Sequence, residues 1–219
     1  MKLAIIGQGG HSKVIHDIVK AIKGIEIVGY FDDKYDQSYM HQGIQYGRVL
    51  SAKNMLDHID DIKFVVAIGN NKVRKMIVES LNLLDPRYAV LIHPSAIISP
   101  SATIGYGSVV MANAVVNADA VIQKHTIINT GSVIEHDTKV GDFAHISPKA
   151  TLTGNVTVEE GVHIGAGATI VPQISVGKWS TIGAGATVTK NIPNDCTAIG
   201  TPARIKVGKK LIGGGQVVK

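Results

Sequence analysis

The sequence has a single cysteine, few aromatic residues and no long apolar run. Cys196 alone excludes an internal disulfide and a zinc site built on paired thiolates, and it fits a reducing compartment. We interpret Cys196 as a structural thiol rather than a nucleophile. No apolar run approaches the roughly 20 residues of a membrane span, and the apolar stretch at residues 3–6 is shorter than the core of a signal peptide. We therefore expect a cytoplasmic protein that does not interact with a membrane.

Aromatic residues make up only 5% of the chain, and the positive residues are dispersed apart from a basic run at 204–210. A nucleic-acid platform needs aromatic rings interleaved with basic side chains, so we do not expect nucleic acid as a partner. The formal net charge of +5 also suits small polyanions such as nucleotides. With 45% apolar residues, the 219 residues can fold as one large domain or two small ones.

Residues 1–91 alternate strand-like and helix-like stretches. We predict strands at residues 2–6, 25–31, 63–68 and 88–92, and helices near residues 11–22, 50–58 and 71–84. Alternation of this kind predicts a small parallel sheet flanked by helices.

From residue 92 onward, an aliphatic residue recurs at every sixth position. The sixteen positions are Ile98, Ile104, Val110, Val116, Ile122, Ile128, Ile134, Val140, Ile146, Leu152, Val158, Ile164, Ile170, Val176, Ile182 and Val188. The residue two positions earlier is usually small, as at Ala114 and Ala120. A hexapeptide period is a signature of the parallel β-helix, in which stacked coils bury one another's apolar column. Three hexads close one 18-residue coil, so the repeats predict about five coils with the aliphatic residues inside.

Four histidines interrupt the repeats, namely His125, His136, His145 and His163. His136 is followed directly by Asp137, and a histidine oriented by a carboxylate can act as a general base. His145 and His163 are 18 residues apart and therefore lie one coil apart on the same edge. Histidines on neighbouring coils and chains can alternatively bind zinc. The zinc interpretation does not explain residues 1–91.

A glycine-rich turn follows the first predicted strand, with glycines at Gly7, Gly9 and Gly10. A strand, a glycine turn and a helix are the parts with which dinucleotide-binding proteins hold a pyrophosphate. Asp32, about 25 residues after Gly7, ends the second strand, where an acidic residue can bind ribose hydroxyls. However, Ser12 stands where the third glycine of the dinucleotide fingerprint belongs, and no second mononucleotide-binding half follows. An NAD-dependent dehydrogenase is therefore disfavoured.

Further motifs lie along nearly the full length: "GQGGHS", "FDD", "VVAIGNN", "IEHD", "FAHIS" and two copies of "IGAGAT". In this order they resemble bacterial nucleotide-sugar acetyltransferases, a family that includes UDP-amino-sugar N-acetyltransferases, sialic acid O-acetyltransferases and acetyltransferases of exopolysaccharide biosynthesis. The resemblance implies an α/β Rossmann-like N-terminal domain at residues 1–91 that binds the nucleotide sugar. A left-handed parallel β-helix of hexapeptide repeats follows at 92–205, and residues 206–219 form a C-terminal tail.

The resemblance also assigns roles to individual residues. It implies that His136 is the catalytic base, assisted by Asp137, which is shorter than the glutamate often found there. Acetyl-CoA is expected at His145, Ala166 and Ala184, mainly through backbone contacts at the two alanines. The implied substrate-binding residues are Gly9, Gly10, His11, Asp32, Asp33 and Gly69.

The implied function is acetyl-CoA-dependent N-acetylation of the amino group of a UDP-linked amino sugar in bacterial polysaccharide or glycan biosynthesis. The alternative is O-acetylation of a sugar or sialic acid; a non-catalytic scaffold is a further, less favoured interpretation. No metal is expected, and the resemblance implies a homotrimer. His136 and His145 are nine residues apart, half of an 18-residue coil, so they do not occupy equivalent points of one chain. A coenzyme that contacts both histidines therefore indicates that a neighbouring chain completes the site.

Overall fold

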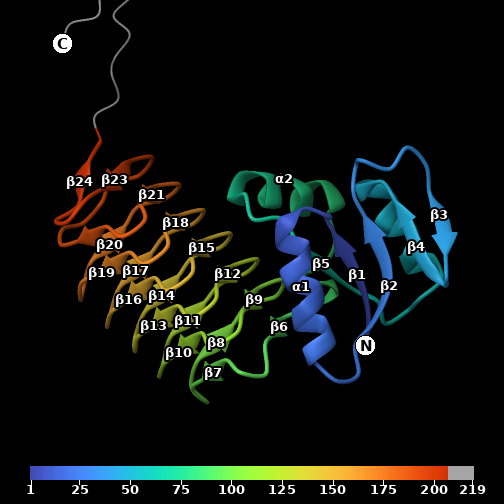
Figure 1. The fold of residues 1–219 in the computed structure, drawn as a ribbon, viewed down its shortest axis with the longest axis horizontal. Coiled ribbons are helices and arrows are strands. Elements are labelled where there is room, and N and C mark those ends of the chain that lie inside the picture. The colour runs from blue at the N-terminus through green and yellow to red at the C-terminus, as the bar shows by residue number, and fades with distance from the viewer. Residues whose placement is uncertain (207–219) are drawn as a thin grey trace, which may run out of the picture.

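The computed structural model describes residues 1–206. They form an N-terminal α/β unit and a parallel β-helix, and the α/β unit packs against the first coils of the β-helix (Figure 1). The sheet of the α/β unit, sheet A, has the strand order β3-β4-β2-β1-β5. Its strands are β1 (Lys2–Ile6), β2 (Glu26–Phe31), β3 (Tyr39–His41), β4 (Ile44–Gly47) and β5 (Lys63–Val66). All pair in parallel except β3, which runs antiparallel to β4.

Alternate residues of β1 face different layers of the α/β unit. Leu3 and Ile5 pack with helix α1 (Gly10–Ala21), which lies between sheet A and the first coils of the β-helix (Figure 1). Ala4 and Ile6 pack on the other face with the 3-10 helix η1 (Val49–Asp57) and helix α2 (Asn71–Leu81). Because both faces of the strand are covered, its sequence is a continuous apolar run.

Several predicted elements of the first 92 residues differ in the structure. The predicted helix near 50–58 is the 3-10 helix η1, and the β3–β4 hairpin was not predicted. The helix predicted at 71–84 ends at Leu81, because Asn82 adopts a left-handed conformation with φ 44° and terminates it. A short 3-10 helix, η2 (Asp85–Arg87), follows.

The prediction of a last sheet-A strand at 88–92 was wrong. Tyr88 forms only an isolated bridge to Phe64 of β5. Strand β6 (Leu91–Ile92) pairs instead with β9 (Val109–Val110) and begins the β-helix. An apolar run does not by itself reveal which sheet it joins, since either sheet buries it.

The hexapeptide repeats form the predicted β-helix, with three parallel sheets named here B, C and D. Sheet B contains β6, β9, β12 (Ile127–Ile128), β15 (His145–Ile146), β18 (His163–Ile164), β21 (Thr181–Ile182), β23 (Thr197–Ile199) and the antiparallel β24 (Arg204–Ile205). Sheet C contains β7 (Ile97–Ile98), β10 (Val115–Val116), β13 (Val133–Ile134), β16 (Thr151–Leu152), β19 (Thr169–Ile170) and β22 (Thr187–Val188). Sheet D contains β8 (Thr103–Ile104), β11 (Val121–Ile122), β14 (Lys139–Val140), β17 (Thr157–Val158) and β20 (Ser175–Val176).

The register confirms the 18-residue coil, since Val133 pairs with Val115 and Ile134 with Val116. Fourteen of the sixteen repeat aliphatics are buried, and Ile98 and Ile104 in the first coil are partly buried. At most corners, a residue with positive φ stands three positions before the aliphatic, as Asp137 does with φ 60°. The small residue that follows is buried in the turn. A corner therefore needs left-handed backbone and then a small side chain, which explains the spacing of the repeat.

The outward face of sheet B changes character along the stack. The first residues of its first three strands, Leu91, Val109 and Ile127, are buried against α1 in one apolar cluster. The next residues in this column are polar: His145, His163, Thr181 and Thr197. The apolar cover that α1 gives to sheet B thus ends before His145.

No helix within residues 1–206 has the length and apolar character needed to cross a bilayer. Most of the predicted tail, residues 207–219, lies outside the described residues, together with the end of its basic run.

Candidate active site

Three of the predicted substrate-binding segments meet at one edge of sheet A, because β1, β2 and β5 are parallel and end there. Gly9 and Gly10 follow β1, and Gly69 follows β5. A Cβ atom built on any of these three glycines meets nothing within 4 Å. In contrast, Gly7 has φ 97°, and its Cβ would lie 2.7 Å from Ile68. Gly7 is therefore required by the turn, whereas the other three glycines border open space that a ligand can occupy.

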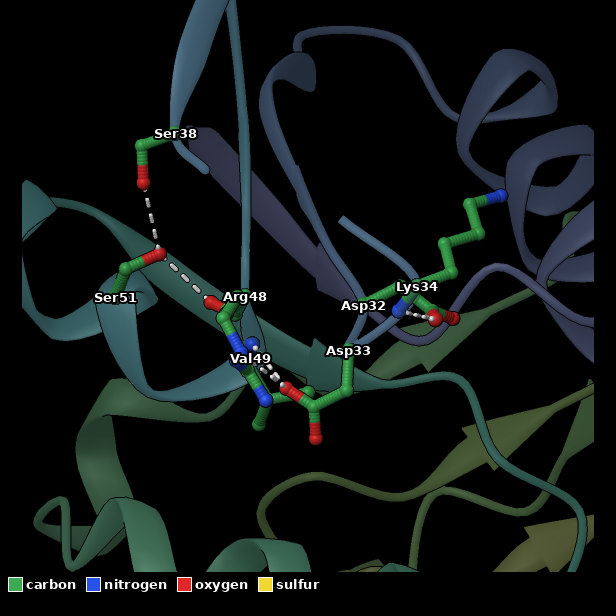
Figure 2. A network of polar contacts seen from close by, with 7 residues as sticks. All are labelled: Asp32, Asp33, Lys34, Ser38, Arg48, Val49 and Ser51. Atoms are coloured by element: carbon green, nitrogen blue, oxygen red, sulfur yellow. Dashed lines mark hydrogen bonds and ion pairs between the residues drawn. The ribbon is translucent and has the colours of Figure 1, made fainter. Parts of the chain in front are cut away.

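The two acidic residues after β2 have different partners. Asp32 accepts hydrogen bonds from the backbone N–H of Gln8 (2.7 Å) and of Lys34 (3.0 Å), so it holds the glycine turn at the end of β2. Figure 2 shows the Asp33 carboxylate directed instead at the start of η1. There it accepts from Val49 N (3.2 Å) and lies 3.7 Å from Arg48 Nε. The structure does not bring the Asp33 carboxylate to the glycine turn, and its role in binding substrate stays a prediction.

His11, in the first turn of α1, extends toward the β-helix, and its ring centre is 6.5 Å from that of His145. Burial, followed by the nearby charge of Arg74, lowers the pKa of His11 to about 4, so the ring is neutral at physiological pH. Its Nε2 atom is buried and has no hydrogen-bond partner within residues 1–206. An orphaned buried nitrogen is costly unless a ligand pairs with it.

A cleft of about 460 Å³ lies between the start of α2 and the strands of sheet B that α1 does not cover. Gly69 and Lys72 line it from the α/β unit. His145, His163 and Trp179 line it from the β-helix. Gly69, predicted to bind the nucleotide sugar, and His145, predicted to bind acetyl-CoA, therefore border the same cavity.

His145 is held in one neutral form. Burial lowers its pKa to about 3, with further contributions from the neighbouring His163 and Arg74. Its Nδ1 lies 3.4 Å from the carbonyl oxygen of Gly69, which only accepts hydrogen bonds, so we assign the proton to Nδ1. Nε2 then accepts from the side-chain amide of Asn129 at 3.0 Å. Because both nitrogens are engaged, His145 has no spare N–H for an oxyanion.

The two alanines predicted to contact acetyl-CoA are exposed at successive corners between sheets B and C. They lie one coil apart, and Gly185 N, beside Ala184, donates to the carbonyl oxygen of Ala166 at 2.8 Å. This corner adjoins the sheet that carries His145, so one extended ligand can contact all three residues.

His136 and Asp137 lie at a corner between sheets C and D and do not line the cleft. Nδ1 of His136 is 2.7 Å from an Asp137 carboxylate oxygen, and both side chains are about 60% exposed. This hydrogen bond raises the pKa of His136 above its ordinary value. With Nδ1 oriented by the carboxylate, Nε2 is free to accept a proton. The structure therefore separates His136 from His145 within one chain.

Arg74 was missed by the sequence analysis. Its guanidinium is buried at the junction of the α/β unit and the β-helix. The available signal was its position on α2, where Arg74, Ile77 and Leu81 form the buried face. A charged residue at an apolar-face position is unusual and indicates a specific environment. Trp179 of the cleft was likewise not predicted as a site residue. His163 was singled out by its 18-residue spacing from His145 but was given no role in binding the substrate or acetyl-CoA.

No group of three or more histidine, cysteine, aspartate or glutamate side chains suited to hold a metal ion occurs within residues 1–206.

Comparison with known proteins matches both halves of the chain. Residues 2–81 match the family described as PglD N-terminal domain, and residues 155–190 match the bacterial transferase hexapeptide family of six repeats. The chain is 46% identical over 105 residues to UDP-N-acetylbacillosamine N-acetyltransferase of Bacillus subtilis, covering 48% of this chain and 49% of that relative. The chain thus spans about half the length of the curated relatives it matches.

Two solved structures are similar over nearly the whole chain. PerB from Caulobacter crescentus, in complex with CoA and GDP-perosamine, is 35% identical with a TM-score of 0.84, covering 94% of this chain and 98% of that one. The acetyltransferase domain of PglB from Neisseria gonorrhoeae, in complex with acetyl coenzyme A, is 41% identical with a TM-score of 0.80, again covering 94% and 98%.

Proposed function

Because the chain belongs to the nucleotide-sugar acetyltransferases that join a PglD-type N-terminal domain to hexapeptide repeats, we propose that it acetylates the amino group of a nucleotide-linked amino sugar. Acetyl-CoA is the proposed donor. The observation that carries the proposal is the shared cleft, which Gly69 lines from the α/β unit and His145 from the β-helix. A nucleotide sugar held by one unit and a coenzyme held by the other would meet there.

In the proposed reaction, the amine nitrogen attacks the thioester carbonyl of acetyl-CoA. The C–N bond forms, the C–S bond breaks and CoA leaves as a thiol. Nε2 of His136 takes the proton from the amine and then gives it to the departing sulfur, which regenerates the neutral base. Asp137 orients the ring through Nδ1 and stabilises the imidazolium. Backbone N–H groups are the better candidates for the oxyanion, because the nitrogens of His145 are already engaged.

The N-terminal domain would hold the nucleotide diphosphate at the start of α1. The cap residue Gly9 makes no side-chain cap hydrogen bond, and the first turn has no acidic residue. Such a helix terminus favours phosphate. The open space beside Gly10 supports a ligand at this position. We propose UDP as the nucleotide, since the 46% identical relative is named for a UDP-sugar, with GDP as the alternative suggested by PerB.

The separation of His136 from the cleft supports a homotrimer with sites between chains. One chain would supply Gly69 and His145, and the His136–Asp137 corner of its neighbour would complete the site. The exposure of this corner leaves it accessible to a second chain. A cytoplasmic location is part of the same proposal, and the lone Cys196 fits a reducing compartment.

The proposal is tested by measuring thiol release from acetyl-CoA with a panel of acceptors. The panel contains UDP- and GDP-linked 4-amino sugars, the matching sugars with a hydroxyl in place of the amine, and sialic acid. We expect release only with amines. Release only with hydroxyl acceptors would replace the proposal by O-acetylation, and release with no acceptor would favour a scaffold.

A further inference from the structure

One buried cation joins the α/β unit to the β-helix. Only 1% of Arg74 is exposed. On the side of the α/β unit, its Nη1 donates to the carbonyl oxygens of Ile68 (2.9 Å) and Gly69 (3.3 Å). On the side of the β-helix, Nε donates to His125 O (2.8 Å) and Nη2 to Phe143 O (2.7 Å). The guanidinium therefore binds main-chain oxygens of both units at once.

These oxygens belong to the two segments that carry the halves of the site. Gly69 borders the cleft itself, and the residues before His145 are Phe143 and Ala144. Ala144 O is a further, longer acceptor from Arg74 at 3.3 Å. The Gly69 carbonyl also lies 3.4 Å from His145 Nδ1. A shift of Arg74 would therefore displace the Gly69 segment relative to His145.

The position of Arg74 has an energetic cost. No carboxylate lies within ion-pair distance of Arg74 in residues 1–206. Burial lowers its pKa to about 9, so it remains charged at neutral pH. An apolar side chain in its place would leave these main-chain oxygens buried without a donor, which costs free energy. What arginine supplies is a rigid, planar set of donors that can hold several carbonyls in fixed directions.

We propose that Arg74 is a positioning residue that fixes Gly69 relative to His145, and thereby the sugar amine relative to the thioester. This inference rests on the proposed function. Burial lowers the pKa values of His11, His145 and His163, and the Arg74 charge contributes to each shift.

The test replaces Arg74 by lysine in the full-length protein. The lysine ammonium is a compact point charge and does not reproduce the planar set of donors of the guanidinium. Carbonyl oxygens of one unit therefore lose their donor. A misplacement of about 1 Å can cost roughly 10²-fold in rate, and we expect kcat to fall by about that factor. Dissociation constants for UDP and CoA, measured separately by calorimetry, should stay unchanged, because each half-site lies on its own unit. An unchanged kcat in folded Arg74→Lys protein would overturn the proposal, as would a matching loss of either affinity.

Lys75→Met is the matched control. Lys75 also links α2 to the β-helix, through a 2.6 Å ion pair with Glu160, but this pair lies at the partly exposed edge. We expect its kcat to stay near that of the unmodified chain. An equal loss of kcat would mean that any weakening of the junction suffices and would contradict a specific role for Arg74.

Two further measurements keep the inference testable if turnover or folding fails. Arg74→Met supplies a second variant with a long side chain and no charge; we expect low kcat in the folded protein. Hydrogen exchange of the first turn of α2, residues 70–74, should speed up in the Arg74 variants and not in Lys75→Met. Unchanged exchange there would overturn the positioning role. If the unmodified chain acetylates no acceptor, the proposed function fails while the exchange result still decides the role of Arg74.

Discussion

Replacing Gly154 by alanine is expected to move the imidazole of His136 and leave the fold intact. Gly154 lies one coil beyond His136, at the following corner between sheets C and D. A Cβ on Gly154 would lie 2.6 Å from His136 Nε2 and 2.7 Å from Cε1. Gly154 does not have positive φ, so its backbone accepts alanine. The clash is with the end of an exposed side chain, which can rotate away more easily than a packed backbone segment can shift.

The magnitude follows from these distances. Restoring an ordinary contact of at least 3.4 Å requires the ring to move by about 0.8 Å. Since a misplacement of about 1 Å can cost roughly 10²-fold in rate, we expect kcat to fall between about 10- and 10²-fold. The melting temperature should change little. Thiol release at saturating acetyl-CoA and acceptor measures the first quantity, and circular dichroism the second.

A double-mutant cycle supplies the control. His136→Ala alone should lower kcat by roughly 10²–10⁴-fold, as expected for loss of a general base. Adding Gly154→Ala to that variant should cause no further loss, because the ring that the new Cβ displaces is absent. Full kcat in Gly154→Ala, or an effect that persists in the absence of the imidazole, would contradict this displacement of the His136 ring.

Three further predictions test the remaining parts of the site. Asp137→Asn removes the charged acceptor that raises the pKa of His136. Since the base must be neutral, the rising limb of the pH–rate profile should move to lower pH, and an unmoved limb would contradict the pair. Gly10→Val should weaken binding of UDP-sugar and leave CoA affinity intact in calorimetry, because its side chain enters the open space beside the glycine turn; tight NAD binding without a response to UDP would reverse the nucleotide assignment. Mixing inactive His136→Ala and His145→Ala chains should restore part of the activity if the sites lie between chains, whereas verified subunit exchange without recovery would place both histidines in one chain's site.

The β-helix was predictable from the residues because its rule is local. Each inward aliphatic, such as Ile134, is specified by its own hexad, and the small residue two positions earlier marks the corner. Stacking then repeats this rule with an 18-residue register. The hexad spacing also places His136 at a corner. Its pairing with Asp137 was predictable because the two residues are adjacent in the chain.

The glycine turn was predictable for a similar reason. Gly7 must adopt φ 97° directly after a buried strand, and this constraint is visible in the sequence as strand, glycine and helix. The neighbouring acidic pair was not resolved in this way. Asp32 and Asp33 are equivalent in a motif, but tertiary packing directs the first to the glycine turn and the second to η1.

The junction between the two units depended on packing of segments distant in the chain. No local pattern states that β6 joins sheet B, or that the cover of α1 over this sheet ends before His145. His145 is neutral because it is buried at this junction. Arg74 donates there to main-chain oxygens of residues that lie 51 to 70 positions further along the chain. Periodicity records which side chains are buried within an element, whereas desolvation and hydrogen bonding at a junction depend on which surfaces meet.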